Sequence, residues 1–439
     1  MNSEQHEVQL GDYVELLTGF PFKSAAYVDA ADAVRLLRGD NIGQGRLRWE
    51  DAKRWPLDKC SDLDGFKLRE GDVVLAMDRP WIPAGLKFAK VRRDDIPAFL
   101  VQRVARLRPR AGIATNFLHY VIASSAFTQH IQNVTTGTAV PHISAKQIRE
   151  YRFELPDLST QEACGDVLMA LDDRIALLRE TNATLEAIAQ ALFKSWFVDF
   201  DPVRAKQQGI APAGMDEATA ALFPDSLAES VLGLVPQSWR LGALDDLADL
   251  NSRSWSGRNH PERVRYLDLA NVKDNEIVAV TDFAFDDAPS RARRALRNGD
   301  TIVGTVRPGN RSFAFIHEPE PHLTASTGFA VLSPRAVDSV AFVYLAATLD
   351  ASIEHLAHVA DGGAYPAVRP DVVSALACVV PSAAVLHAFN AAACRLLEKV
   401  SANQCQAQTL ATLRDTLLPR LISGQLRLPE SQPMMESKP

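Results

Sequence analysis

The sequence of 439 residues has few cysteines and no long apolar run, and both absences narrow the kinds of protein it can be. Its five cysteines are scattered without a Cys-x-x-Cys pair, which fits free thiols in a reducing compartment better than disulfides or zinc ligands. No apolar stretch approaches the roughly 18 residues of a membrane span. The first ten residues are polar and acidic, unlike a signal peptide. We therefore expect a cytoplasmic protein that does not enter a membrane.

The sequence also lacks the motifs of several enzyme classes. It contains no Gly-x-x-x-x-Gly-Lys-Ser/Thr nucleotide loop and no Gly-x-Ser-x-Gly elbow. Phe200-Asp201-Pro202-Val203 comes nearest to the Asp/Asn-Pro-Pro-aromatic tetrad of amino-methyltransferases, but it lacks the second proline and the aromatic residue. Asp51-Ala52-Lys53 resembles a nuclease carboxylate and lysine pair without its preceding strand, and His355 and His358 lack a third metal ligand. We predict a chain with no catalytic residue, no metal and no cofactor.

The feature that organises the chain is an internal repeat with an offset of about 225 residues. Leu155-Pro156 before one long helical pattern returns as Val380-Pro381 before another, and Pro141 aligns with Pro366. Repeats have to be read first because they fix the architecture. Two similar halves are typical of a protein whose target also has two halves.

Periodicity within each half predicts an α+β unit. β-type runs at 72–77 and 99–107 precede a helical patch over Asn116–Val134, and the second half repeats this scheme with a helix near Ala341–Val359. The Gly-rich loops before Pro141 and Pro366 either carry function or merely close a bend. The predicted fold class is therefore α+β, with two pseudo-repeated α+β domains separated by two long helices that form an antiparallel coiled coil. The predicted segments are domain 1 at 1–155, helix 1 at 156–200, an acidic linker at 201–235, domain 2 at 236–380, helix 2 at 381–425 and a disordered tail at 426–439.

Both long helices carry a heptad seam, with apolar residues at alternating spacings of three and four. The chain order, unit and helix followed by unit and helix, predicts that the two helices pair antiparallel. A helix of about 40 residues would be about 60 Å long and would set the distance between the two units. Asn182 and Asn403 in the seam either fix the register of the helix pair or are simply solvated. If the two halves fold independently, each long helix would instead pack only within its own domain. The predicted seam consists of Leu171, Ile175, Leu178, Asn182, Leu185, Leu192, Trp196, Leu396, Val400, Asn403, Leu410, Leu417 and Leu421.

Charge is distributed unevenly along the chain, although the net charge is −7. Residues 1–155 hold 22 Lys and Arg against 19 Asp and Glu, whereas 201–250 hold 3 against 8. Positive charge concentrated in the units favours a polyanionic partner, the alternative being basic surfaces that are merely solvated. Arg, Lys, Asn and Gln are the side chains that contact DNA bases and phosphates. The DNA-binding candidates are Lys23, Asn41, Gln44, Arg46, Arg48, Arg79, Lys87, Arg253, Arg258, Arg307, Asn310 and Arg311.

Several motifs together resemble the specificity subunits of type I restriction-modification systems over nearly the whole chain. The second half departs from the pattern at Leu241-Gly242-Ala243, where a Leu-Gly-Asp opening is expected, and in the loop before Pro366. The matching segments are Leu10-Gly11-Asp12, Thr18–Ser24 with Tyr27, Arg38–Ile42, Gly71–Val74, Gly137–Ile143, Leu155-Pro156 with Gln161, Trp196–Pro202 and Leu417–Gly424.

This resemblance implies a non-catalytic subunit that recognises a bipartite site on double-stranded DNA with two target recognition domains. It further implies partners: two methyltransferase (modification) subunits bound through the helices, with restriction (motor and nuclease) subunits joining them. The complex would methylate adenine and defend against phage. The alternative is an assembly scaffold without sequence readout of its own, which would leave the six arginines between Arg291 and Arg311 unexplained.

Overall fold

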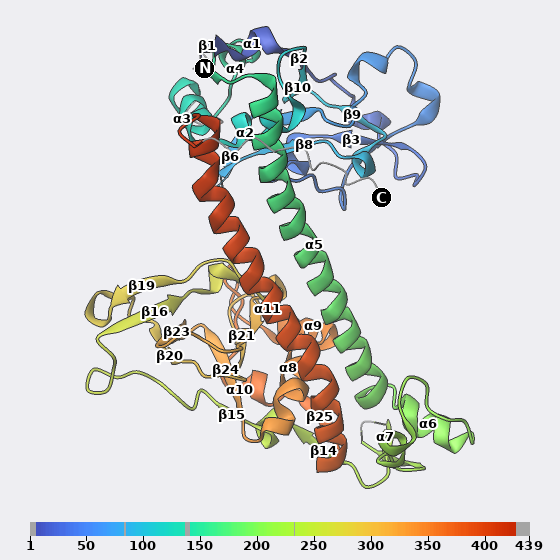
Figure 1. Cartoon of the computed structure of the whole chain (residues 1–439). Coiled ribbons are helices and arrows are strands. Elements are labelled where there is room, and N and C mark those ends of the chain that lie inside the picture. Colours follow the sequence, from blue (N-terminus) through green and yellow to red (C-terminus); the bar gives the residue numbers. More distant parts are fainter. Residues whose placement is uncertain (1–5, 83–84, 137–140, 232, 427–439) are drawn as a thin grey trace, which may run out of the picture. The chain divides into compact units, whose positions relative to one another are not determined.

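The computed structural model describes residues 6–82, 85–136, 141–231 and 233–426 (Figure 1). The chain forms two compact units, one of Met1–Ala176 with Gln408–Pro439 and one of Leu177–Ala407. Both contain strands and helices in separate segments, which confirms the predicted α+β class. The loop residues Gly137–Val140 and the predicted tail beyond Leu426 lie outside the described residues.

The first unit contains an antiparallel sheet of order β2-β10-β5-β8 and a mixed sheet of order β4-β3-β9 in which β3 and β9 run parallel. Two smaller antiparallel pairs join β1 to β11 and β6 to β7. The strands are β1 His6–Gln9, β2 Val14–Thr18, β3 Val34–Leu37, β4 Arg54–Trp55, β5 Val73–Ala76, β6 Trp81–Ile82, β7 Gly85–Leu86, β8 Phe88–Lys90, β9 Ala98–Leu100, β10 Val104–Pro109 and β11 Arg152–Leu155. The helices are α1 Leu10–Tyr13, α2 Thr115–Ala123, α3 Ser125–Val134 and α4 Ala145–Arg149.

The second unit repeats this topology. Its antiparallel sheet has the order β15-β24-β21-β22, and its mixed sheet β19-β16-β23-β20 again contains one parallel pair, β16 with β23. Smaller pairs join β12 to β13, β14 to β25 and β17 to β18. The strands are β12 Leu227–Ser230, β13 Gly233–Pro236, β14 Arg240–Ala243, β15 Ala248–Leu250, β16 Arg263–Leu267, β17 Val272–Lys273, β18 Glu276–Ile277, β19 Thr281–Ala284, β20 Ala292–Ala295, β21 Thr301–Gly304, β22 Phe313–Phe315, β23 Leu323–Ser326, β24 Phe329–Pro334 and β25 Ala377–Val380. The helices are α6 Asp201–Gln207, α7 Glu217–Ala221, α8 Val340–Thr348, α9 Asp350–Val359 and α10 Pro370–Ser374.

Three predicted elements are each broken in two. The run at 99–107 divides into β9 and β10 because Arg103 adopts a left-handed backbone, with φ of 71°. The patch Asn116–Val134 divides into α2 and α3 at Ser124, whose hydroxyl accepts a hydrogen bond from the Phe127 N–H and so starts a new helix. The helix predicted at Ala341–Val359 divides at Leu349, which is extended.

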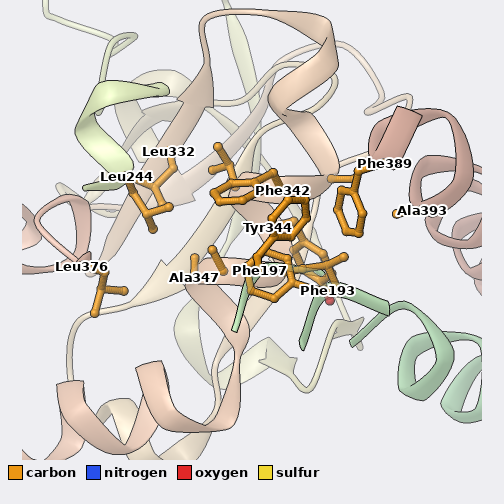
Figure 2. Packing of buried hydrophobic residues seen from close by; sticks show 14 of the residues in the cluster. Phe193, Phe197, Leu244, Leu332, Phe342, Tyr344, Ala347, Leu376, Phe389 and Ala393 are labelled. Atoms are coloured by element: carbon orange, nitrogen blue, oxygen red, sulfur yellow. The ribbon is translucent and has the colours of Figure 1, made fainter. Parts of the chain in front are cut away.

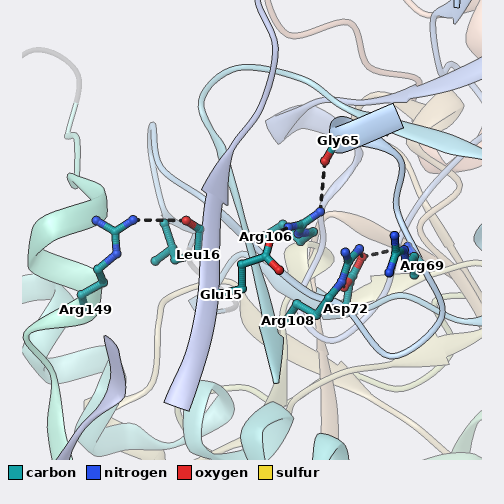
Figure 3. A network of polar contacts seen from close by, with 8 residues as sticks. All are labelled: Glu15, Leu16, Gly65, Arg69, Asp72, Arg106, Arg108 and Arg149. Carbon is teal, nitrogen blue, oxygen red and sulfur yellow. Dashed lines mark hydrogen bonds and ion pairs between the residues drawn. The ribbon is translucent and has the colours of Figure 1, made fainter. Parts of the chain in front are cut away.

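The same turn precedes the central strand of each antiparallel sheet. Asp72 is only 1% exposed, accepts the Arg69 N–H and pairs with the Arg108 guanidinium at 2.7 Å (Figure 3). Asp300 is likewise buried and accepts the Arg297 N–H at the same 2.8 Å that Asp72 shows. Because a buried carboxylate is costly unless it is hydrogen-bonded, these contacts hold the start of β5 and of β21 in place.

The two long helices are α5, Leu158–Phe197, and α11, Ala383–Ile422, both continuous over 40 residues (Figure 1). In the first unit Arg414 of α11 pairs with Asp172 of α5 at 2.5 Å, and Leu421 shares a buried cluster with Cys164. In the second unit Asn403 lies opposite Asn182, and Phe389, near the start of α11, packs on Trp196, near the end of α5. Each unit thus contains an antiparallel stretch of the predicted coiled coil. Every predicted seam residue is buried or half-buried.

An aromatic cluster joins α5, α11 and the sheet within the second unit (Figure 2). The Phe197 ring lies 4.8 Å from the Phe389 ring and 4.9 Å from the Phe342 ring, centroid to centroid. Edge-to-face pairs of this kind add about 0.5–1.5 kcal/mol each beyond the area that they bury.

The segment predicted as an acidic linker is folded. It holds α6, α7 and the β12–β13 hairpin, and Val203, Phe223 and Val235 are buried in the same core as Phe197. Acidic composition alone did not reveal these few anchoring apolar residues.

The seam asparagines form a buried pair. Asn403 Nδ2 donates to Asn182 Oδ1 at 2.8 Å, and Asn182 Nδ2 donates to the Val400 carbonyl at 3.1 Å.

Asn403→Leu should lower the free energy of unfolding by about 1–3 kcal/mol, because the Asn182 oxygen loses its donor in a dry seam. Adding Asn182→Leu should recover part of the loss, measured by denaturant unfolding as a double-mutant cycle. Gln406→Leu, at an exposed position of α11, is the control and should change stability by less than about 0.5 kcal/mol. Additive losses from the two Asn variants would contradict the pairing.

Candidate nucleic-acid interface

An arginine occupies the same strained position in both units. Arg79 follows β5 with φ of 45°, and Arg307 follows β21 with φ of 48°. The Arg79 N–H donates to the Pro141 carbonyl at 2.7 Å, and the Arg307 N–H donates to the Pro366 carbonyl at the same distance. A left-handed backbone costs a residue other than glycine roughly 1–2 kcal/mol. The fold therefore holds these two exposed arginines in place through the proline loops of the repeat.

The first unit has a concave surface beside Arg79 with a volume of about 520 Å³. Arg38 reaches it from the end of β3 and Arg103 from the end of β9, and parallel strands bring these two ends to the same edge of the mixed sheet. The Met77 N–H donates to the Arg103 carbonyl at 2.9 Å, which joins this edge to the end of β5. Lys87, just before β8, completes the surface, which we call the cationic hollow. It is lined by Phe22, Ser24, Tyr27, Arg38, Gly39, Asp40, Asp78, Arg79, Lys87, Val101, Gln102 and Arg103.

Positive charge exceeds negative charge in the cationic hollow. Arg38 is 3.2 Å from Asp40, and Arg103 is 3.7 Å from Asp78, which also accepts a hydrogen bond from His142 Nδ1 at 2.6 Å. Among the described residues, neither the Arg79 guanidinium nor the Lys87 ammonium has an acidic partner within ion-pair distance. Burial lowers the pKa of Lys87 from its ordinary value; the nearby Asp40 opposes this shift, and Arg48 and Arg79 add to it. The hollow can therefore attract an anion.

Two contacts orient the Arg307 guanidinium in the second unit. Its guanidinium lies 4.7 Å from the centre of the exposed Tyr365 ring and donates to the Ala364 carbonyl at 2.8 Å. Stacking on an aromatic ring orients a guanidinium while leaving most of its five donors free. Such a planar, oriented fork suits recognition of a phosphate or of a guanine edge.

Comparison with known proteins shows which proteins this chain resembles. A family model described as "Type I restriction modification DNA specificity domain" matches residues 3–187. The HindI specificity subunit of Haemophilus influenzae is 24% identical over 408 residues, covering 82% of this chain and 87% of that protein. The MjaIX specificity subunit of Methanocaldococcus jannaschii is 22% identical, covering 73% and 71%.

The chain is thus similar to the specificity subunits of type I restriction-modification systems, over residues 3–187 by the family model and over most of its length by these relatives. The crystal structure of an S subunit from M. genitalium has a similar fold, with a TM-score of 0.54 at 15% identity over 96% of each chain. The resemblance predicted from the motifs is confirmed by the family model and by these relatives.

The structure separates the predicted DNA-binding residues of this chain into groups. Arg79 and Lys87 meet in the cationic hollow, with Arg48 nearby. Asn41 is buried, where its side chain accepts the Arg38 N–H and donates to the Arg48 carbonyl, which favours a role in the turn. The exposed candidates that are not brought into the hollow are Lys23, Gln44, Arg46, Arg253, Arg258 and Asn310.

Two arginines of the cationic hollow, Arg38 and Arg103, were not among the predicted contacts. Arg38 belongs to a segment that resembles the family, so its motif was an available signal. Arg103 lay inside an apparently continuous β-type run, and nothing local indicated its left-handed turn.

The sequence predicts neither a membrane span nor a metal site. No single helix among the described residues is long and apolar enough to cross a membrane, although the bent pair Val337–Thr348 and Asp350–Val359 passes that test on length and composition. Over the described ranges, no group of three His, Cys, Asp or Glu side chains could hold a metal ion. The absence of a metal or cofactor from the working protein stays a prediction.

Arg311 is engaged within the fold. Its guanidinium is 2.5 Å from Asp274 and 2.7 Å from Asp350, and it lies over the Phe313 ring. Arg311→Ala should therefore lower the free energy of unfolding by about 1 kcal/mol, a value kept small because the pairs are partly exposed. Thermal unfolding of Arg311→Ala beside Arg307→Ala provides the measurement. A larger loss for Arg307→Ala would contradict this assignment.

Proposed function

We propose that this chain is the DNA specificity subunit of a type I restriction-modification complex and recognises a bipartite site with one unit for each half. The observation that carries the proposal is the equivalence of Arg79 and Arg307: each follows the corresponding strand with the same backbone conformation and the same hydrogen bond to a proline loop. The names of the related proteins support the same assignment.

Arg79 and Arg307 have different surroundings, which supports recognition of a different DNA half-site by each unit. Arg79 borders a hollow rich in cations, whereas Arg307 stacks on Tyr365. Because sequence is read by side chains aimed at base edges, two units with the same backbone and different side chains can read different sequences. A scaffold without readout is disfavoured, since it would gain nothing from holding exposed arginines in a costly conformation.

Catalysis belongs to partner subunits in this proposal. The chain supplies DNA recognition and directs adenine methylation and restriction by two modification subunits and the restriction subunits that join them. A cytoplasmic location and a role of the helix pair in setting the spacing between half-sites stay predictions. The bounds of the six segments given from the sequence also stay proposals.

Equivalent exposed apolar residues on the long helices support two identical partners. Ile188 of α5 is 49% exposed, and Leu413, which follows it at the repeat offset of 225, is 45% exposed on α11. Large apolar side chains exposed on both repeats are suited to contact with a protein partner. We propose that each contacts one modification subunit.

Arg79→Ala and Arg307→Ala should each impair one half-site and spare the other. Loss of a base contact costs about 1–3 kcal/mol and relaxes specificity at that position. The measurement is the motif of methylated adenines in the genome of cells that express each variant, obtained by single-molecule sequencing. Arg311→Ala is the matched control and should leave the motif unchanged. Loss across both half-sites from either variant would contradict the division of labour.

Ile188→Glu and Leu413→Glu should each reduce the number of bound modification subunits from two to one, because a carboxylate would be buried against an apolar surface. Native mass spectrometry of the complex measures the count. Ala183→Glu introduces the same charge at an exposed position on another side of α5 and serves as the control. Two bound copies in both variants would overturn this docking assignment.

A further inference from the structure

The cationic hollow contains Lys87, whose ammonium has no hydrogen-bond or ion-pair partner among the described residues. Lys87 is 8% exposed. A Cβ added to Gly39, which also lines the hollow, would lie 3.9 Å from Lys87 Nζ. The ammonium is therefore at the wall of the hollow.

A buried cation without a partner is unfavourable for folding. Burial is the largest cause of the lowered pKa of Lys87, which means that the folded state holds this proton less tightly than the unfolded chain does. Replacing Lys87 by an apolar side chain of similar length should therefore leave stability the same or raise it. A group that costs stability where it lies is typical of a binding site.

The second unit fills the corresponding place differently. The Ala76 N–H donates to the Lys87 carbonyl, and in the same register the Gly304 N–H donates to the Ser312 carbonyl. Likewise Arg103 corresponds to Gly328, because their carbonyls accept from Met77 and from Thr305.

The short helical turn after the parallel strand also differs. In the first unit it begins at Gly39 after Arg38, and in the second at Leu269 after Asp268. The Leu269 side chain lies against Gly328, where an added Cβ would come within 2.5 Å of it. In the second unit, Leu269 therefore occupies the place that is open beside Gly39 in the first unit, and Asp268 replaces Arg38.

We infer that the cationic hollow of the first unit is a subsite for a DNA backbone phosphate, held by Lys87 together with Arg38 and Arg103 beside the base-reading Arg79, and that the second unit lacks this subsite. The inference rests on the proposed function. The excess of cations suits a full negative charge, and lysine provides a point charge rather than the fork that reads a base edge.

Lys87→Met removes the charge and keeps the length of the side chain. Binding of the full chain with its modification subunits is measured by fluorescence anisotropy over a salt series, on a duplex that carries the methylated motif and on one of mixed sequence. The expected result is weaker binding to both duplexes and a slope of log K against log salt that is smaller by about 1. The methylated motif should be unchanged, and the unfolding midpoint should not fall.

Gly39→Leu tests the same subsite without touching a charge. Its backbone is not left-handed, and an added Cβ would meet its neighbours only at 3.9 Å, so the leucine should fill the hollow without strain. The loss of affinity and the smaller slope should match those of Lys87→Met.

Lys90→Met is the matched control. Lys90 lies three residues from Lys87 and is half-buried, but its ammonium donates to Asn116 at 2.6 Å inside the fold. Its loss should lower stability and leave the salt slope unchanged.

Two results would overturn the inference. An unchanged slope in both Lys87→Met and Gly39→Leu would show that no phosphate binds here, and a motif degenerate at one base of one half-site would show a base edge instead. Failure of the proposed function is distinct, because it would appear as the absence of any bipartite methylated motif in the wild type. The mixed-sequence duplex would still report on the phosphate contact in that case.

Discussion

The antiparallel contact between α5 and α11 is the interaction on which each unit is built. In the first unit, Asp172 accepts hydrogen bonds from Arg414 and from the Tyr120 hydroxyl, at 2.5 and 2.6 Å, so one carboxylate joins both helices to α2. In the second unit the Asn275 side chain donates to Glu186 of α5 at 2.5 Å, and Gln404 of α11 donates to the Asn275 carbonyl at 2.7 Å. Partly buried polar contacts of this kind favour one arrangement, because any shift would leave them unsatisfied.

This dependence explains why the helices match in the two halves more closely than the loops do. A seam residue must satisfy its neighbours on the opposite helix, and a partner subunit that docks on both repeats needs the same outer surface on each. A loop at a sheet edge meets only solvent and ligand, so its sequence can change at little cost to stability.

The sequence was sufficient for the parts of the fold that arise from local periodicity. The seam of α5, with Ile175, Leu178 and Asn182 among its residues, follows from spacings of three and four alone. The helix breaks at Ser124 and Leu349 were missed, because hydrophobic periodicity continues across a cap that one residue makes. The parallel pairing of β3 with β9 depends on contacts between residues over 60 positions apart, which no local pattern reveals.

The candidate site was predictable only in part for the same reason. Residue type pointed to Arg79, Lys87 and Arg307, since cations near turns are common in DNA-binding surfaces. Residue type could not separate Arg307 from Arg311, four positions away, which is neutralised by two carboxylates contributed by distant segments. Nor could it place Arg38 beside Arg103, because that meeting is a consequence of sheet topology.

The two units show how one scaffold can acquire two specificities. The buried aspartate turn before the central strand and the left-handed arginine after it are the same in both, and together they fix the backbone of that strand at its two ends. The substituted positions, Lys87 against Ser312 and Gly39 against Leu269, lie on loops whose backbone hydrogen bonds stay in register. Exchange at such positions alters shape and charge without breaking the ladder beneath them. Recognition can therefore diverge between the halves while the strand that carries it and the helices that support it remain under the same constraints.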